Sequence, residues 1–203
     1  MSRPREKQGY HHGDLRRSLI EQGLILVREV GIEALSLRQL AERVGVSTPA
    51  LYHHFRNKQA LLAALGEAGI VRFEAALHPA LMADCPVDAF VLAYVRFARD
   101  NPQIYELVFG GATWRNPEAD DFRLAARHSV RVLGEHLQRA QRSGRLPAEV
   151  NVLRLIQVGW ATLHGLCRMY NDGLAFTPET IEDIARHAVL LLRTAIGMHQ
   201  PAP

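Results

Sequence analysis

Apolar residues recur along the chain at intervals of three and four, which is the spacing of one buried face of an α-helix. Leu15, Leu19, Leu26 and Val30, for example, fall on one such stripe. Alternating apolar and polar residues, which are typical of strands, do not recur. The pattern therefore predicts an all-α protein.

Glycine and capping residues delimit the first two helices. The first is expected over 14–30, because Gly31 suits a left-handed C-terminal cap. Ser36 and Gln39, three residues apart, form a capping box for a second helix over 37–44.

Polar caps also begin the next two helices. Ser47 caps a short third helix that ends near Phe55. Asn57 caps a fourth over about 58–77, which Pro79 ends or kinks. Further helices are predicted over 86–100, 102–110, 118–143, 151–171 and 178–198, the last after the start signal Thr177-Pro178-Glu179.

Residues 37–55 have the pattern of two helices joined by a tight turn. Gly45 permits the turn, and Leu51 and Phe55 anchor the second helix to the core. Its outward residues are Thr48, Pro49, Ala50, Tyr52, His53 and His54. Small residues at the start and hydrogen-bonding residues further along suit a helix in the major groove of DNA. A partly buried Tyr52 and merely solvated histidines are the alternatives.

This stretch resembles the DNA-binding domain of the TetR family of transcriptional regulators. The resemblance rests on Ala41, Gly45-Val46-Ser47, Leu51-Tyr52-His53-His54-Phe55, Lys58 and Leu61. With the preceding helix it covers residues 10–65. It implies a helix-turn-helix over about 36–55 that binds a pseudo-palindromic operator in double-stranded DNA.

The resemblance also implies roles for single residues. Thr48, Pro49 and Ala50 are expected near bases, Tyr52 and His53 near phosphates, and Lys58 on the phosphate backbone. The full set of expected DNA-binding residues is Ser47, Thr48, Pro49, Ala50, Tyr52, His53, His54, Lys58 and Arg38. Residues 1–9 are expected to form a flexible basic arm whose Arg3, Arg5 and Lys7 enter a minor groove.

Basic residues are concentrated at the N-terminal end. Residues 1–58 hold ten Lys and Arg against six Asp and Glu, and the rest of the chain holds fourteen against fifteen. Such asymmetry is expected where one end of a protein meets a polyanion. Arg28, Arg38, Arg43 and Arg56 are interpreted as surface charges, with Arg38 and Arg56 also placed near the phosphates.

The C-terminal half carries a second motif. Trp160 and His164 lie one helical turn apart, and Gly165 follows. Together with Tyr10-His-His-Gly-Asp-Leu15, this resembles the TetR-family subgroup with a Trp-x-x-x-His-Gly motif in its regulatory domain. The resemblance divides the chain into a DNA-binding domain over 10–65 and a regulatory and dimerisation domain over 66–199, with the boundary inside the fourth helix.

The last predicted helix is apolar almost all round over 187–198, so it must be covered on all sides. Its own chain cannot easily do this, which favours a homodimer. The resemblance implies the same, with two helices per subunit forming a four-helix bundle. The expected interface residues are Leu155, Gly159, Leu163, Val189, Leu192 and Ile196. A helix buried at the centre of a monomer is the alternative.

Aromatic residues with polar tips suit an apolar pocket that offers a few hydrogen bonds to a small-molecule effector. The candidate lining residues are Phe90, Tyr94, Phe97, Tyr105, Phe109, Trp114, Trp160 and His164. For each of them, ordinary core packing is the alternative.

The leading hypothesis is a DNA-binding repressor that a small molecule releases from its operator. A regulator that responds to a protein partner, or to nothing, is the second hypothesis. A helical enzyme is disfavoured, because the sequence has no phosphate loop, no HExxH motif and no paired carboxylates on a helix. No cofactor and no metal is expected.

The remaining features indicate a cytoplasmic protein without membrane contact. The start of the chain is polar and basic, unlike a signal peptide, and no apolar run is long enough to span a bilayer. Cys85 and Cys167 lie far apart without CxxC spacing, which suits a reducing compartment.

Overall fold

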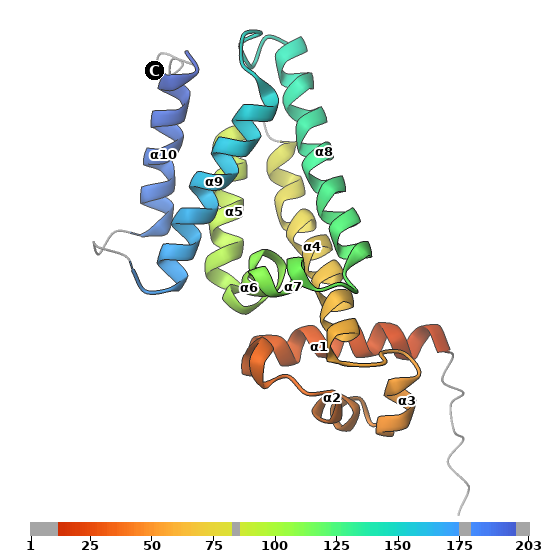
Figure 1. The fold of residues 1–203 in the computed structure, drawn as a ribbon. Helices are drawn as coiled ribbons and strands as arrows, with labels where there is room; N and C mark the ends of the chain where they lie inside the picture. The colour runs from red at the N-terminus through yellow and green to blue at the C-terminus, as the bar shows by residue number, and fades with distance from the viewer. Residues whose placement is uncertain (1–11, 83–85, 175–179, 198–203) are drawn as a thin grey trace, which may run out of the picture.

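The structure is a computed structural model that describes residues 12–82, 86–174 and 180–197. Every regular element in these ranges is a helix, which confirms the all-α prediction. In chain order the helices are α1 (His12–Ala34), α2 (Leu37–Val44), α3 (Thr48–Tyr52), α4 (Lys58–Leu81), α5 (Pro86–Asp100), α6 (Pro102–Phe109), α7 (Gly111–Arg115), α8 (Asp120–Arg142), α9 (Val152–Asn171) and α10 (Ile181–Ala195), as labelled in Figure 1.

The predicted caps at the N-terminal end are confirmed. The Ser36 hydroxyl accepts a hydrogen bond from the Gln39 amide at 3.2 Å. The Ser47 hydroxyl accepts one from the Ala50 amide at 3.3 Å. Gly45 has a φ of 76°, the left-handed conformation that the turn between α2 and α3 requires.

Three helix ends in the first half differ from the prediction. Gly31 has the expected positive φ, 78°, yet the chain resumes a helical turn that ends at Ala34. The third helix is shorter than expected and ends at Tyr52. α4 continues through Pro79 to Leu81, only one further turn beyond the predicted end.

Two further differences lie in the second half. α7 was not predicted, because two consecutive glycines, Gly110 and Gly111, indicate a break between helices. In the structure, extended backbone at Gly110 separates α6 from α7. The last helix begins at Ile181 after the cap Thr180, whose hydroxyl accepts from the Asp183 amide at 3.3 Å. The predicted start at Thr177-Pro178-Glu179 lies outside the described residues.

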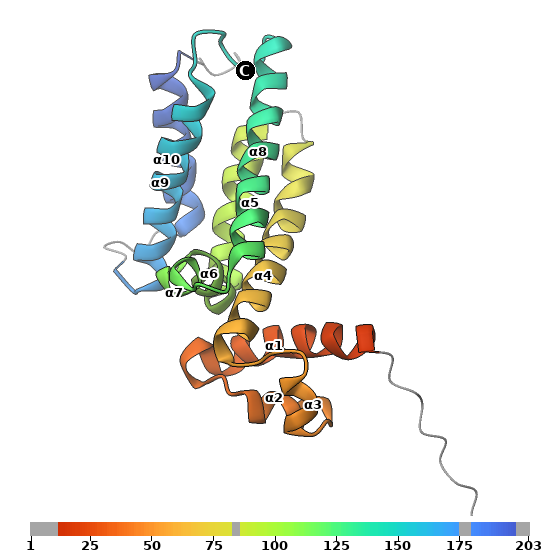
Figure 2. The same cartoon turned by 45° about the vertical axis from the view of Figure 1, so that its right-hand side comes forward.

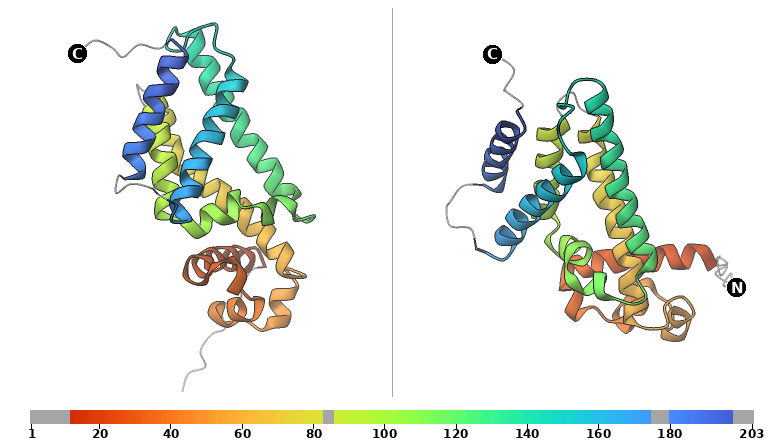
Figure 3. Two further views of the ribbon diagram at one scale, coloured as in Figure 1. Left: turned by 60° about the vertical axis from the view of Figure 1, so that its left-hand side comes forward. Right: turned by 45° about the horizontal axis from the view of Figure 1, so that its top comes forward.

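The helices form two groups stacked end to end. α1 to α3 lie together, and α4 begins among them and rises into the second group (Figures 1 and 2). α4, α5, α8, α9 and α10 run along the second group, while the short α6 and α7 cross its base above α1 (Figures 1 and 3). One continuous apolar core runs through both groups. Within the described ranges, no helix has the length and apolar character needed to cross a membrane.

Two glycines of α4 allow the base of the bundle to pack closely. A Cβ at Gly66 would lie 2.7 Å from Thr113 Cγ2, and a Cβ at Gly69 would lie 2.8 Å from Val108 Cγ2. Both distances are too short for real carbon contacts, so α6 and α7 reach α4 only because these positions lack side chains.

α10 packs on one side only. Ile181, Ala185 and Val189 are buried, and α5 is the neighbour that α10 contacts most extensively. Ion pairs from Arg99 to Glu182 and from Arg193 to Asp88 fasten the two helices. On the other side Leu191 is 64% exposed, so one chain leaves part of this apolar helix uncovered, as the sequence predicted.

Candidate nucleic-acid interface

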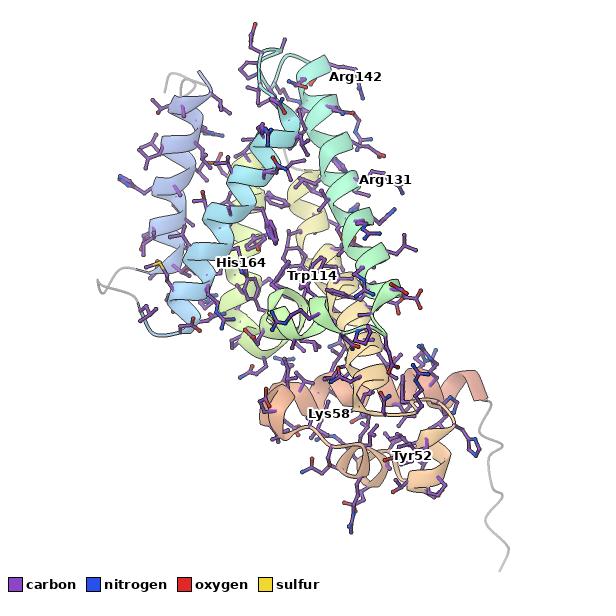
Figure 4. The ribbon with its side chains drawn as sticks, viewed as in Figure 1. Tyr52, Lys58, Trp114, Arg131, Arg142 and His164 are labelled. Atoms are coloured by element: carbon purple, nitrogen blue, oxygen red, sulfur yellow. The ribbon has the colours of Figure 1, made fainter. Side chains whose placement is uncertain are left out.

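α3 presents a short polar face on an apolar anchor. Leu51 and Phe55 are fully or almost fully buried, as predicted. Tyr52 is 49% exposed, so it is partly buried yet still presents surface to solvent (Figure 4). Pro49 and His53 are also exposed, whereas Thr48, Ala50 and His54 are partly exposed. Ser47 is exposed as well, and its hydroxyl caps α3.

Arg43, which was predicted to be a surface charge, joins α2 to α1. The Arg43 guanidinium pairs with the Glu29 carboxylate and donates to Gln22 Oε1 at 3.1 Å. The hydrogen bonds from Arg43 to the Glu29 carboxylate, together with the positive charge of Arg43, lower the pKa of Glu29. Arg38, by contrast, pairs with Glu42 one turn away on α2, and its side chain is 83% exposed.

Lys58 bridges two elements at the edge of this face. Its ammonium donates a 2.8 Å hydrogen bond to the backbone carbonyl of Glu33, at the end of α1. An ammonium has three N–H donors, so further donors remain for an anion. Lys58 therefore holds the start of α4 against α1 while keeping hydrogen-bonding capacity for a phosphate.

Arg56 is a surface charge, as the sequence predicted, and it also contacts the helical bundle. Its Nε donates to Glu118 Oε2 at 3.1 Å, and Asn57 Nδ2 donates to Glu118 Oε1 at 2.9 Å. These bonds lower the pKa of Glu118, with the Asn57 hydrogen bond as the largest cause. No local sequence signal pairs Glu118 with Arg56, because the two residues are 62 positions apart. The arm residues Arg3, Arg5 and Lys7 lie outside the described residues.

Most of the predicted pocket residues gather in one aromatic cluster around Phe109. Its ring centroid lies 4.8 Å from that of Tyr105, 6.0 Å from Tyr94 and 6.5 Å from Trp160. Phe73, which was not predicted, packs edge-on against Phe109 at 5.0 Å. The cluster also includes Phe90, Phe97 and His164.

Trp114 is the exception among the predicted pocket residues. Its ring packs on Phe122 at 4.9 Å, and its Nε1 donates to the Val108 carbonyl at 2.9 Å. It therefore joins α7 to α6 and α8 at the base of the bundle (Figure 4). The sequence placed it with the other aromatic residues because α7 itself was not predicted.

A polar chain runs through the aromatic cluster. The Tyr94 and Tyr105 hydroxyls lie 3.1 Å apart, and the Tyr105 hydroxyl lies 2.8 Å from His164 Nδ1. Burial raises the pKa of both tyrosines and lowers that of His164, so all three side chains are neutral near pH 7. Burial also raises the pKa of the nearby Cys167 thiol to about 12. The cluster thus offers uncharged hydrogen-bonding groups in an apolar setting.

Two hollows among the described residues lie away from this cluster. A groove of about 560 Å³ on the outside of α4 and α8 is lined by Glu67, Asp121, Leu124, Ala125, Arg127, His128 and Arg131. A smaller one of about 150 Å³ lies where α1 and the α3–α4 turn meet α8. The aromatic rings, in contrast, pack against one another.

The expected dimer residues separate into two groups. Leu163 is 4% exposed and Val189 is 3% exposed, so both belong to the core of their own chain and do not offer a surface to a partner. These two side chains face inward, which periodicity alone did not resolve. Leu155, Gly159, Leu192 and Ile196 are partly exposed.

An all-helical chain that carries a helix-turn-helix beneath a helical bundle has the architecture of a two-domain DNA-binding regulator. Two family models match it. The model of bacterial regulatory proteins of the tetR family matches residues 19–65, and that of the tetracyclin repressor-like C-terminal domain matches residues 87–193. The chain belongs to the tetR family.

Individual relatives agree with this assignment. The chain is 45% identical over 82 residues to the tetracycline repressor protein class A from transposon 1721 of Escherichia coli, a match that spans 40% of the chain and only 37% of that repressor. A solved structure of a protein of unknown function from Rhodococcus sp. RHA1 is 31% identical, with a TM-score of 0.80, and the match covers 94% of the chain and 99% of that protein. AibR, solved with isovaleryl coenzyme A and operator DNA, is 21% identical with a TM-score of 0.60, over 87% of the chain and 96% of AibR.

Proposed function

We propose that the protein is a transcriptional repressor that binds operator DNA through α3 and is released by a small-molecule effector. The observation that carries this proposal is the exposed face of α3, which Leu51 and Phe55 fix in place beside Lys58. Family membership supports the same function.

In this proposal the residues of α3 divide between bases and phosphates. Thr48, Pro49 and Ala50 approach base edges, where small side chains allow a close fit. Tyr52 and His53 contact phosphates, and Lys58 adds a charged donor at the start of α4. The other proposed contributors are Ser47, His54 and Arg38, and the region from 10 to 65 is the DNA-binding domain.

We further propose a homodimer that pairs the uncovered sides of α9 and α10. Support comes from apolar side chains exposed on both helices, including Leu153 and Val158 on α9 and Leu191 on α10. Gly159 adds a point of close approach, since nothing lies within 4 Å of a Cβ built there. Two-fold symmetry then presents two α3 helices to half-sites about 34–36 Å apart, one helical turn of DNA.

The aromatic cluster is the proposed effector region. Its neutral hydroxyls and imidazole favour an amphipathic ligand whose polar end carries no net charge. Rotation of Trp160, which is 47% exposed, would open the cluster from the side of α9. The motif from Trp160 to Gly165 places the chain, in this proposal, in the subgroup with a Trp-x-x-x-His-Gly regulatory domain. The protein then acts in the cytoplasm by binding and not by catalysis.

Reciprocal binding tests the effector part of this function. Small amphipathic compounds that raise the melting temperature of the protein should weaken its complex with operator DNA, by about 5–150-fold for a typical coupling. A compound that binds free and DNA-bound protein equally well would contradict release by an effector.

A further inference from the structure

A short loop between α7 and α8 docks on the start of α4. Asn116 is 3% exposed, and its Nδ2 donates to the Gln59 carbonyl at 2.8 Å. Its Oδ1 accepts from the Glu118 amide at 3.0 Å. Asn116 therefore holds Glu118 in position on the side of the bundle that faces α3.

Glu118 binds the turn that connects α3 to α4. One carboxylate oxygen accepts from Asn57 and the other from Arg56, at 2.9 and 3.1 Å. The Glu118 side chain is only 19% exposed, whereas that of Arg56 is 75% exposed, so the hydrogen bond with Asn57 is better shielded from solvent than the ion pair with Arg56. The Asn57 side-chain oxygen, Oδ1, accepts a hydrogen bond from the Ala60 backbone amide at 2.7 Å and so caps α4. A single carboxylate thus contacts the turn that ends α3 and the cap that begins α4.

The two helix groups are also joined by α4, which runs through both, and by the packing of α1 on α6. The Glu118 contact lies at the α3–α4 turn, away from the α1–α6 contact, and so restricts the tilting of α3 that these attachments leave. Around Glu118 the apolar packing is incomplete, because the hollow of about 150 Å³ lies there, lined by Arg16, Phe55 and Phe122 among others. On this side the polar contacts of Glu118 take the place of dense packing.

We infer that Glu118 is a positioning residue that fixes the angle of α3 relative to the C-terminal bundle, acting through Arg56 and Asn57. This inference rests on the proposed function, since the angle matters when two α3 helices of a dimer must meet successive major grooves. Fixing the angle in the free protein lowers the ordering cost of binding and restricts the spacing of half-sites that the dimer accepts.

Operators with altered spacing test this role. Binding is measured for the best operator and for versions with one base pair added or removed between half-sites. Glu118→Ala should weaken binding to the best operator at least about fivefold, the lower end of typical coupling between sites, and should reduce the penalty for altered spacing. Glu118→Gln keeps an acceptor for Asn57 and should lie between Glu118→Ala and the natural protein. Loss of stability alone would not change spacing preference.

Glu135→Ala is the control, because it removes one exposed glutamate from α8, the helix that follows Glu118 in the chain. It should leave affinity and spacing preference unchanged. Unchanged spacing preference in both Glu118 variants, or tighter binding, would overturn the inference while leaving the proposed function intact. If the natural protein itself shows no preference for any DNA sequence, both are overturned.

Discussion

The Lys58 ammonium donates a hydrogen bond to the Glu33 carbonyl across a heavy-atom distance of 2.8 Å. Glu33 lies in the last turn of α1, where backbone carbonyls lack helical partners and attract positive charge. Lys58 itself begins α4, where its charge is unfavourable unless an anion is nearby. The contact with Glu33 offsets part of that cost in the free protein, and a DNA phosphate would offset more.

Replacing Lys58 by alanine should weaken DNA binding by a similar factor for all sequences. A phosphate contact carries no base information, and its loss should flatten the dependence of log affinity on log salt concentration by about one. Fluorescence anisotropy at several salt concentrations measures both effects. Arg142→Ala removes one positive charge from the far end of α8 (Figure 4) and serves as the control. Equal salt slopes in the two variants would contradict the proposed role.

Replacing Tyr105 by phenylalanine should destabilise the fold. The change removes a hydroxyl that lies between Tyr94 and His164 and leaves buried polar partners unsatisfied, at a cost of about 1–3 kcal/mol. Urea unfolding monitored by circular dichroism measures this loss. Tyr170→Phe, at a partly exposed tyrosine on α9, should cost much less. Equal losses of stability in the two variants would mean that the hydrogen bonds of the Tyr105 hydroxyl do not stabilise the fold.

Acid should destabilise the protein partly through His164. Burial and Arg168 lower the pKa of His164 in the folded state, so the unfolded chain takes up a proton at higher pH than the folded chain does. Its contribution to stability is present above the ordinary value of about 6.5 and is lost as pH falls below it. His164→Gln retains an acceptor for Tyr105 and should reduce the pH dependence of unfolding between about pH 6.5 and 5. An unchanged slope would contradict this prediction.

Leu191 tests the proposed dimer surface. Leu191→Glu places a charge on the uncovered side of α10, and burying it against a partner would be strongly unfavourable. Sedimentation equilibrium should show the dimer weakened at least about tenfold, which corresponds to about 1.4 kcal/mol. Leu124→Glu is a matched control, because Leu124 is 66% exposed on α8 and Leu191 is 64% exposed on α10. Equal dimerisation of the two variants would place the interface elsewhere.

The helix-turn-helix could be predicted from sequence because its signals are local. Ser36, Gly45, Ser47 and Asn57 act on residues within four positions of themselves, and the structure confirms each of these caps and turns. The face of α3 followed from the spacing of Leu51 and Phe55.

The contacts between the helix groups could not be predicted in the same way. Arg56 and Glu118 are 62 positions apart, and only the arrangement of α4, α7 and α8 brings them together. The inward orientation of Leu163 and Val189 likewise depends on how α9 and α10 sit against α5. The position of Trp114 away from the aromatic cluster depends on α7, and Gly110-Gly111 at its start indicated a break instead of a helix.

Selection of bound sequences from random duplex DNA, with purified protein at fixed salt, tests the central claim most directly. The account predicts enrichment of a pseudo-palindrome whose half-sites are one helical turn apart, and loss of that enrichment for the Tyr52→Ala, Lys58→Ala double variant. A folded, dimeric protein that enriches no sequence would contradict operator recognition by α3.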